Sequence, residues 1–559
     1  MDFRGRTIDW FPYAVGGLTI IVLGLFLVYP IGKMVLFSFV EQGKGLTFSN
    51  LTLVNFEDFL AGANTRNALW NSLSVAGLVT FFSTALALPA AYALSRVRIG
   101  FRGLIMALMV IPIVAPPFIG AYAWIILLGR NGLITHFLDG WLGIELPSIY
   151  GLFGIVLALS LHYFPYVFLF VQGALMASDP YIEESARIMG ASRWRILRTI
   201  TFPLLVPTIG AAALIVMVKA LGNFGVPAIL GGEFTVLPTL IYYQINGFFN
   251  LNAASAIALV NVLVTLIAVL ALARVNRKRR FVTVTGTTRR AQRLSGQGTR
   301  IAANIYVWGL LAAALAPQMV IVFTSFAETC GGASLLPTEY GFAVYQSVWE
   351  DSLQPIVNSL LLAGCATALC MIFGTLAAYA VARERIAGKW TIDMTIMLPF
   401  VLPGIVAGVA FLTTFNSGLI VLTGTATILI LAYFVRRIAY MFRAVSAAIE
   451  QVDEKLEEAS TVCGATWAHT MRKITIPLVA PGILAGGILV FTTLITEISI
   501  TVMLFSARWK TISITIFEYL TSDEIQQASA VGTIAILLTL VLVFGTSKLI
   551  GKSMADLFR

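Results

Sequence analysis

Three polar residues interrupt long apolar stretches of the sequence and could do chemistry there. Lys219 and Glu497 are the clearest ionisable residues in such stretches, and Asn223 follows Lys219 by four residues, which on helical spacing puts both on one face. An ionisable side chain inside a membrane is costly, so its presence indicates a functional site by default. We expect Lys219, Asn223 and Glu497 to line a gate on a path through the molecule. The alternatives are a structural Lys219–Glu497 ion pair off that path, or a lysine that snorkels to the surface.

A second set of residues recurs at a fixed spacing in two polar segments, residues 179–199 and 453–473, which we call the first and second Gly-Ala segments. Both follow Glu-x5-Gly-Ala-x11-Pro, with Glu184, Gly190, Ala191 and Pro203 in the first copy and Glu458, Gly464, Ala465 and Pro477 in the second. A glutamate suits the positive end of a helix dipole, glycine adopts a positive φ, and proline opens a helix. The spacing predicts a short helix, a Gly-Ala break, and an amphipathic piece leading into the next apolar helix. Interfacial helices on lipid headgroups would explain one copy, but they explain two matched copies poorly.

The composition identifies the environment of these residues. Of the 559 residues 58% are hydrophobic and 11% charged, whereas a soluble globular chain has about 25% charged residues. So little charge could not solvate a soluble chain of this length, and the composition also excludes disorder and a disulfide-stapled fold. The four cysteines have no metal or disulfide spacing, and the three histidines are scattered. The sequence predicts a polytopic membrane protein.

Twelve apolar runs are long enough, at about 20 residues, to cross a bilayer as helices. The first six lie near residues 11–40, 69–95, 103–129, 150–172, 202–228 and 253–273. The second six lie near residues 301–326, 356–382, 391–415, 417–442, 474–506 and 526–550. The first run is too long for a signal-peptide core and has no A-x-A-like site after it, so we expect it to be retained. The predicted fold class is an all-α integral membrane protein with about 12 transmembrane helices.

The two sets of six runs resemble each other in sequence. AAYALSR at 90–96 recurs as AAYAVAR at 377–383, an offset of 287, which falls to 274 after extra residues around 130–149. Because each set has six runs, the halves keep the same orientation and could enclose a path between them, as in several transporter classes. We predict a first repeat over residues 1–274, a basic cytoplasmic linker over 275–300 and a second repeat over 301–559.

Basic residues predict the orientation. With the N-terminus in the cytoplasm, 30 of the 37 lysines and arginines fall in cytoplasmic segments. This bias follows the positive-inside rule, so both termini are expected in the cytoplasm. The count assigns Arg436, Arg437 and the basic residues up to Lys473 to one such segment. The net charge of +10 is accounted for by this bias, and no nucleic-acid partner is expected.

The two Gly-Ala segments resemble the EAA loop of ABC-importer membrane subunits. The glutamate and glycine are intact in both copies, while the small residues after the glutamate vary, as at Ser185. The resemblance covers nearly the whole chain as two fused permease domains, and it implies the fold of a type I ABC importer permease. It also implies that residues 179–199 and 453–473 are coupling helices that dock on two cytoplasmic ATP-binding subunits. The residues implied in ATPase coupling are Glu184, Gly190, Ala191, Glu458, Gly464 and Ala465.

The same resemblance implies the other partners, the location and the cargo. An extracytoplasmic substrate-binding protein would deliver cargo to this chain in the lipid of a bacterial inner membrane. No cofactor is expected on the chain itself, because ATP and Mg²⁺ belong to the partner subunits. LGNFGVPAILGG at 221–232 and TEISITVMLFS at 496–506 resemble ferric-iron permeases, many of which have an acid where Asn223 stands. Ferric iron is the expected cargo, with 2-aminoethylphosphonate, thiamine or another small polar solute as alternatives, and no metal-ligating residues are assigned.

Other classes fit the sequence less well. The one near match to a P-loop, Gly551-Lys552-Ser553, lacks its first glycine because Thr546 stands there, so no ATPase is expected in this chain. A secondary transporter of the major facilitator type also has six plus six spans, but it does not explain the paired Gly-Ala segments. A membrane enzyme would need a nucleophile with a base, or clustered metal ligands, and the spans contain neither pattern. A purely structural scaffold would not predict the paired segments.

Overall fold

The computed structural model describes residues 10–130, 132–277, 296–330, 337–383, 389–418 and 420–550, and it is almost entirely helical. Much of the predicted linker, and both chain ends, lie outside these residues. The first repeat contains α1 (Trp10–Leu23), η1 (Gly24–Val28), α2 (Tyr29–Ser38), η2 (Phe48–Asn50), α3 (Val54–Ala61), α4 (Ala63–Arg96), α5 (Arg102–Leu108), α6 (Ile111–Val114), α7 (Pro117–Leu128), α8 (Leu133–Leu142), α9 (Leu152–Ala177), α10 (Pro180–Ile188), α11 (Arg193–Ile196), η3 (Leu197–Thr201), α12 (Phe202–Leu221), α13 (Gly225–Leu230), α14 (Leu237–Asn246) and α15 (Leu251–Arg277).

The second repeat follows the same order and adds an antiparallel hairpin. It contains α16 (Gln297–Ser325), β1 (Ala327–Cys330), β2 (Pro337–Tyr340), α17 (Ala343–Arg383), α18 (Lys389–Val401), α19 (Gly404–Phe415), α20 (Ala426–Ile449), α21 (Lys455–Val462), α22 (Trp467–Thr470), η4 (Met471–Thr475), α23 (Ile476–Ile495), α24 (Thr501–Leu504), η5 (Ala507–Trp509), α25 (Ile512–Thr521) and α26 (Ile525–Ile550). The predicted order of elements in each Gly-Ala segment is confirmed, because α10 and α21 are short helices followed by a break and a second helical piece.

The number of membrane-crossing helices differs from the sequence-based expectation at two places. Among the described residues ten helices are long and apolar enough to cross a membrane, or eleven if one bent pair counts as a single span. That pair is α18 and α19, which meet at an angle of 107° where a single run was expected. The other difference is α20, which is 24 residues long but contains Arg436, Arg437 and Arg443. A helix with three arginines is not apolar by composition, so its place in the bundle depends on what pairs with them.

The first helix of each repeat packs against the other repeat. α1 and α2 contact α17, α18 and α19, while α16 contacts α4, α6 and α7. The buried core around α9 accordingly includes Val307, Leu311 and Ala314 from α16. This exchange ties the two repeats together, and the larger buried cluster also contains residues of both.

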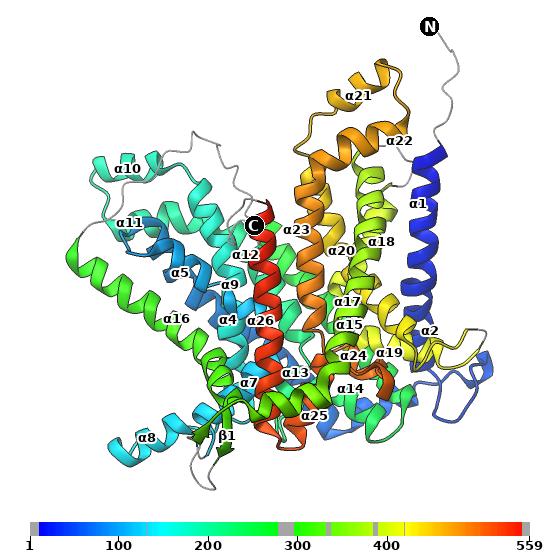
Figure 1. Cartoon of the computed structure of the whole chain (residues 1–559), viewed down its shortest axis with the longest axis horizontal. Helices are drawn as coiled ribbons and strands as arrows, with labels where there is room; N and C mark the ends of the chain where they lie inside the picture. Colours follow the sequence, from blue (N-terminus) through cyan, green and yellow to red (C-terminus); the bar gives the residue numbers. More distant parts are fainter. Residues whose placement is uncertain are drawn as a thin grey trace.

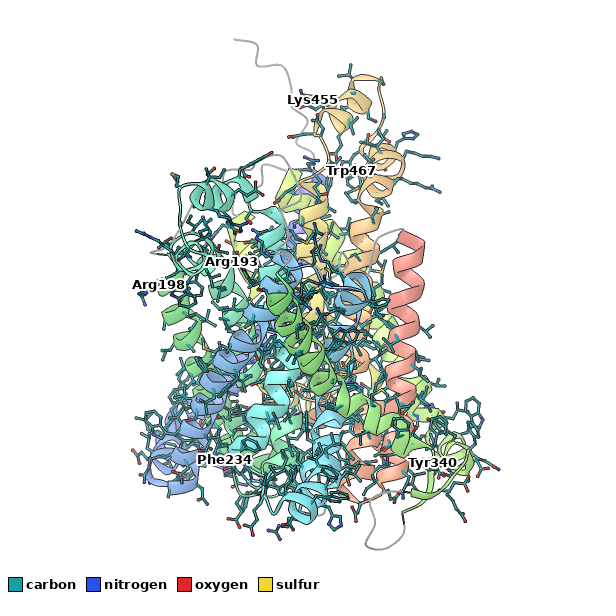
Figure 2. All side chains as sticks on the ribbon, turned by 90° about the vertical axis from the view of Figure 1, so that its left-hand side faces the viewer. Arg193, Arg198, Phe234, Tyr340, Lys455 and Trp467 are labelled. Atoms are coloured by element: carbon teal, nitrogen blue, oxygen red, sulfur yellow. The ribbon has the colours of Figure 1, made fainter. Side chains whose placement is uncertain are left out.

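The two Gly-Ala segments lie on the same end of the molecule. In Figure 1, α10 and α21 lie beyond the helix bundle at its upper end, where α1 begins and α26 ends. Figure 2 shows Arg193 and Arg198 of the first segment and Lys455 and Trp467 of the second at this end, with Phe234 and Tyr340 at the opposite end. The cytoplasmic assignment of the chain ends stays a prediction, since it rests on the distribution of basic residues.

Candidate functional site

A cavity of about 150 Å³ lies between the two repeats and is lined by equivalent elements from both. The first repeat contributes α9, the end of α12 and the breaks that flank α7 and α13. The second repeat contributes α20, the end of α23 and the break between α18 and α19. The breaks follow from sequence, because Pro117 and Pro403 stand where one helix must stop and another begins.

Lys219, Asn223 and Glu497 all line this cavity, so the structure brings the three predicted residues together. α12 ends at Leu221, which puts Asn223 just beyond the helix and not on a helical face shared with Lys219 as expected. Asn223 Oδ1 accepts a hydrogen bond from the backbone N–H of Val226, 3.0 Å away. The break therefore fixes the position of Asn223. Whether the three residues line a transport path stays a prediction.

Glu497 lies at the equivalent break of the second repeat, where its side chain also accepts backbone hydrogen bonds. Its Oε1 accepts hydrogen bonds from the backbone N–H groups of Ser499 at 3.1 Å and Ile500 at 3.4 Å. Ile500 is 274 residues beyond Val226, so the two polar side chains satisfy matching backbone donors. In each repeat this bond between a polar side chain and the backbone lies at the start of the short helix after the break, α13 or α24.

The partners of Glu497 are two arginines of α20 and not Lys219. Arg436 Nε lies 3.3 Å from Glu497 Oε2, and the Arg437 guanidinium donates a short hydrogen bond to the same oxygen. Within the described residues no ion pair joins Lys219 to Glu497, so the Lys219–Glu497 alternative is not what this structure shows. The charge count that put Arg436 and Arg437 in a cytoplasmic segment was wrong. α20 extends to Ile449, and both arginines lie within it beside the cavity.

The Arg436 side chain fits beside α19 because Gly404 has no side chain. A Cβ at Gly404, in the first turn of α19, would lie 2.9 Å from the guanidinium carbon of Arg436 and 2.8 Å from Cβ of Ser499. Arg436 also donates a hydrogen bond to the carbonyl oxygen of Leu402, at 3.1 Å. A side chain at position 404 would displace the arginine from the cavity wall.

The first repeat holds a neutral pair where the second holds the ionic one. Asn223 donates a hydrogen bond to the Tyr163 hydroxyl at 2.9 Å. At the offset of 274, Tyr163 corresponds to Arg437 and Asn223 to Glu497. Both pairs join the helix preceding the Gly-Ala segment to the break after the following span. The offset of 274 between the repeats was the available signal, but the sequence analysis counted Arg437 with a cytoplasmic segment and did not compare it with Tyr163.

Lys219 has a different environment from the arginines. Its Nζ lies 4.8 Å from the centroid of the Tyr166 ring, a cation–π distance. Among the described residues no carboxylate lies within ion-pair distance of this ammonium group, and the side chain is only partly buried. The cavity is thus lined by a lysine that has no carboxylate partner among the described residues.

The Gly-Ala segments have the same local geometry in both repeats. Gly190 and Gly464 have φ values of +85° and +83°, which L side chains rarely adopt. The N–H of Ala191 bonds to the carbonyl of Ala186, and that of Ala465 to Ser460, which closes each short helix. The Gly-Ala pairs are therefore needed for the helix ends. Glu184 is half-buried and Glu458 is exposed, and their role in coupling stays a prediction.

The neighbouring glutamates, Glu183 and Glu457, hold each segment to the bundle, and the sequence analysis missed them. Glu183 pairs with Arg96 at 3.0 Å and accepts a hydrogen bond from Thr201 at 3.0 Å. In the second repeat Glu457 pairs with Arg383 at 3.6 Å and accepts from Thr475 at 3.1 Å. We call each set of three side chains a latch. The two arginines end the repeated AAYALSR and AAYAVAR strings, which was the available signal.

Each Gly-Ala segment also presents two equivalent apolar side chains to solvent. Ile188 and Val462 are both 87% exposed, at the last position of α10 and of α21. Ile182 and Leu456 are also exposed in equivalent positions. Matched exposed apolar residues at one end of a molecule indicate a protein contact.

The described residues hold no group of three or more histidine, cysteine, aspartate or glutamate side chains that could bind a metal ion. Among the described residues that line the cavity, Glu497 is the one carboxylate.

The sequence matches a known protein family in both repeats. The family described as "Binding-protein-dependent transport system inner membrane component" matches the chain twice, over residues 80–281 and 370–556. The chain is 31% identical to the ferric transport system permease protein FbpB of Actinobacillus pleuropneumoniae, over 97% of this chain and 79% of that relative. It is 30% identical to the molybdenum transport system permease protein ModB of Escherichia coli (strain K12), over 37% of this chain and 93% of that relative.

A solved structure of a bacterial ABC transporter involved in the import of the acidic polysaccharide alginate is 24% identical, with a TM-score of 0.41, over 48% of this chain and 96% of that chain. The family match covers most of each repeat, and the FbpB relative extends over nearly the whole chain. The chain therefore belongs to the family of binding-protein-dependent transport system inner membrane components, as an ABC importer permease in which two permease domains are fused.

Proposed function

We propose that this chain forms the translocation path of a ferric-iron importer, with the cavity between the repeats as its gate. The observation that carries the proposal is the cavity itself, which is lined by the same three elements of both repeats. Two related bundles that meet at such a cavity can rock apart toward one side of the membrane at a time. Lys219, Asn223 and Glu497 are then the polar side chains that cargo meets.

The energy for this movement comes from two cytoplasmic ATP-binding subunits, with ATP and Mg²⁺ bound on them. The exposed Ile188 and Val462 are the docking residues that support this part of the proposal. Each lies at the end of a short helix that a latch holds against the bundle. A push on α10 or α21 would therefore be transmitted to α4 and α17. Both termini are then cytoplasmic, and the membrane is the bacterial inner membrane.

Cargo reaches the gate from an extracytoplasmic binding protein. The support for ferric iron is the 31% identity to a ferric transport permease over 97% of this chain. The molybdenum permease relative corresponds in length to one repeat, and it makes an oxyanion the second candidate.

The test is uptake by proteoliposomes that contain the chain, its two ATP-binding subunits and a binding protein loaded with ⁵⁵Fe(III). We expect ⁵⁵Fe uptake that requires ATP and the loaded binding protein. Replacing Ile188→Asp and Val462→Asp together should abolish uptake, because a charge replaces the apolar contact in both docking helices. Trp141→Asp, at an exposed apolar residue of α8 on the opposite end, is the matched control and should leave uptake unchanged.

Uptake without ATP would contradict the importer mechanism and favour a secondary transporter. ATP-driven uptake of molybdate or a phosphonate, with no uptake of iron, would keep the mechanism and replace the cargo.

A further inference from the structure

The charges around the gate cavity do not balance. Its lining includes three basic side chains, Lys219, Arg436 and Arg437, and one carboxylate, Glu497. With His162 neutral, this leaves a formal excess of two positive charges. Charges far from bulk water are costly unless paired, so an unbalanced set in a cavity indicates that a ligand completes it.

The single carboxylate is fully engaged by protein groups. Its Oε2 contacts Arg436 and Arg437, and its Oε1 accepts two backbone hydrogen bonds. Its side chain is 5% exposed, against 17% for Arg436. Glu497 therefore has little capacity left for cargo, while one face of Arg436 still lines the cavity.

Lys219 provides the clearest donor. Its ammonium group lies beside the Tyr166 ring, and within the described residues it makes no ion pair. Tyr440 corresponds to Tyr166 at the offset of 274, and it lines the cavity from the other repeat. An ammonium, a guanidinium and two phenol hydroxyls around one small space form a donor-rich set, which matches the several acceptor oxygens of an oxyanion.

We propose that the gate cavity binds a multivalent oxyanion, held by Lys219 and Arg436 with Tyr166 and Tyr440, and that cargo crosses the gate in anionic form. Two sources have this chemistry: a free oxyanion, or a ferric ion that keeps anionic oxygen ligands around it. A bare ferric cation does not fit, because an excess of positive charge repels it and the one carboxylate is already paired. The inference deepens the proposed function and rests on the cavity being the gate of that importer.

The experiment measures equilibrium binding to the purified full chain in lipid nanodiscs, without ATP-binding subunits or binding protein. The first probe is [³²P]orthophosphate and the second is ⁵⁵Fe(III) presented as its citrate complex. We expect saturable binding of at least one probe, with one site per chain. Phosphate binding alone indicates the free oxyanion, while ⁵⁵Fe binding that excess phosphate displaces indicates the anionic iron complex.

Three variants test the assignment to this cavity. Lys219→Gln should raise the dissociation constant at least about tenfold, the size expected for a lost charge-assisted hydrogen bond. Lys219→Arg should restore most of the affinity, since it keeps the charge. Lys33→Gln is the matched control and should change the affinity less than about twofold, because Lys33 also lies in a membrane span but donates to the carbonyl of Thr414, outside this cavity.

The proposal is overturned if the wild-type chain binds neither probe, or if Lys219→Gln and Lys33→Gln weaken binding equally. It is also overturned if ⁵⁵Fe binds with an affinity that Lys219→Gln does not change. These failures differ from failure of the proposed function, because ATP-driven uptake that depends on Ile188 and Val462 would persist in each case.

Discussion

At the scale of single residues, the two repeats use different side-chain pairs at equivalent positions beside the cavity. Both repeats join the helix before the Gly-Ala segment to a break after the next span. The first repeat uses the neutral Tyr163–Asn223 hydrogen bond, and the second uses the ionic Arg437–Glu497 pair. A buried ion pair adds little net stability over a well-packed neutral pair, whereas removal of one partner leaves an unpaired charge. The ionic version is therefore not explained by added stability, and its stability depends on both partners.

This interpretation predicts a double-mutant result. Glu497→Asn alone should destabilise the chain by about 3–5 kcal/mol, since it leaves Arg437 buried without its partner. Adding Arg437→Tyr, which copies the pair of the first repeat, should recover the part of that loss that comes from Arg437, while Arg436 stays without its carboxylate. The measurement is the unfolding free energy, or its thermal midpoint, of the purified chain. Additive losses in the double variant would show that the two positions are not coupled and would contradict the correspondence.

The sequence was sufficient to bring Lys219, Asn223 and Glu497 to one site, because polar residues inside apolar runs are rare and the repeat offset aligns two of them. It was not sufficient for Arg436 and Arg437. Basic residues near the end of an apolar run predict a cytoplasmic loop, and only the contact with Glu497, 60 residues away, makes them tolerable inside a helix.

At the scale of elements, each Gly-Ala segment is joined to the bundle through a latch and a helical irregularity. Glu183 and Glu457 bring the segment to the end of α4 or α17 and also bond to a threonine of η3 or η4. Both η elements are π-helical turns at equivalent positions, and such turns are frequent at functional sites. The segment is therefore connected rigidly to two spans, which is what transmission of a docking force requires.

The latch predicts an uncoupled phenotype. Arg96→Met removes the partner of Glu183 and should lower uptake per ATP hydrolysed about tenfold, within the usual range of coupling between sites. ATP hydrolysis itself should persist, because the ATP-binding subunits remain intact. The measurement is the ratio of ⁵⁵Fe uptake to phosphate release in the reconstituted complex. Arg98→Met, at an exposed arginine two residues on, is the control, and an equal loss there would contradict a specific role for the latch.

Element order was predictable because hydropathy and the Gly-Ala-Pro spacing are local signals. The 107° bend between α18 and α19 was not, since it depends on prolines within an apolar run whose depth in the bundle the sequence does not reveal. The latch was missed for a related reason. Two adjacent glutamates occur in both copies, and their spacing alone does not tell which one turns toward the bundle.

At the scale of the whole molecule, two related repeats in one chain meet at the cavity that Lys219 and Glu497 line. α1 and α2 pack against the second repeat, and α16 packs against the first. We therefore expect the first helix of each repeat to move together with the other repeat. Both Gly-Ala segments lie on one end of the molecule, which is the arrangement that the proposed docking of two ATP-binding subunits needs (Figure 1). On the proposed mechanism, the cavity opens to opposite sides of the membrane in turn.

The most direct test is the side from which Thr493, a residue that lines the cavity, can be labelled. Thr493→Cys is introduced into a chain whose native cysteines are replaced by alanine, and the complex is treated with a membrane-impermeant thiol reagent from either side. We expect the reagent to label Thr493→Cys from one side of the membrane at rest, and from the other side when vanadate traps the ATP-binding subunits. Thr539→Cys, at a fully buried position of α26, should stay unlabelled. Labelling of Thr493→Cys from the same side in both states, or from neither side in either state, would show that the cavity does not open to the two sides in turn.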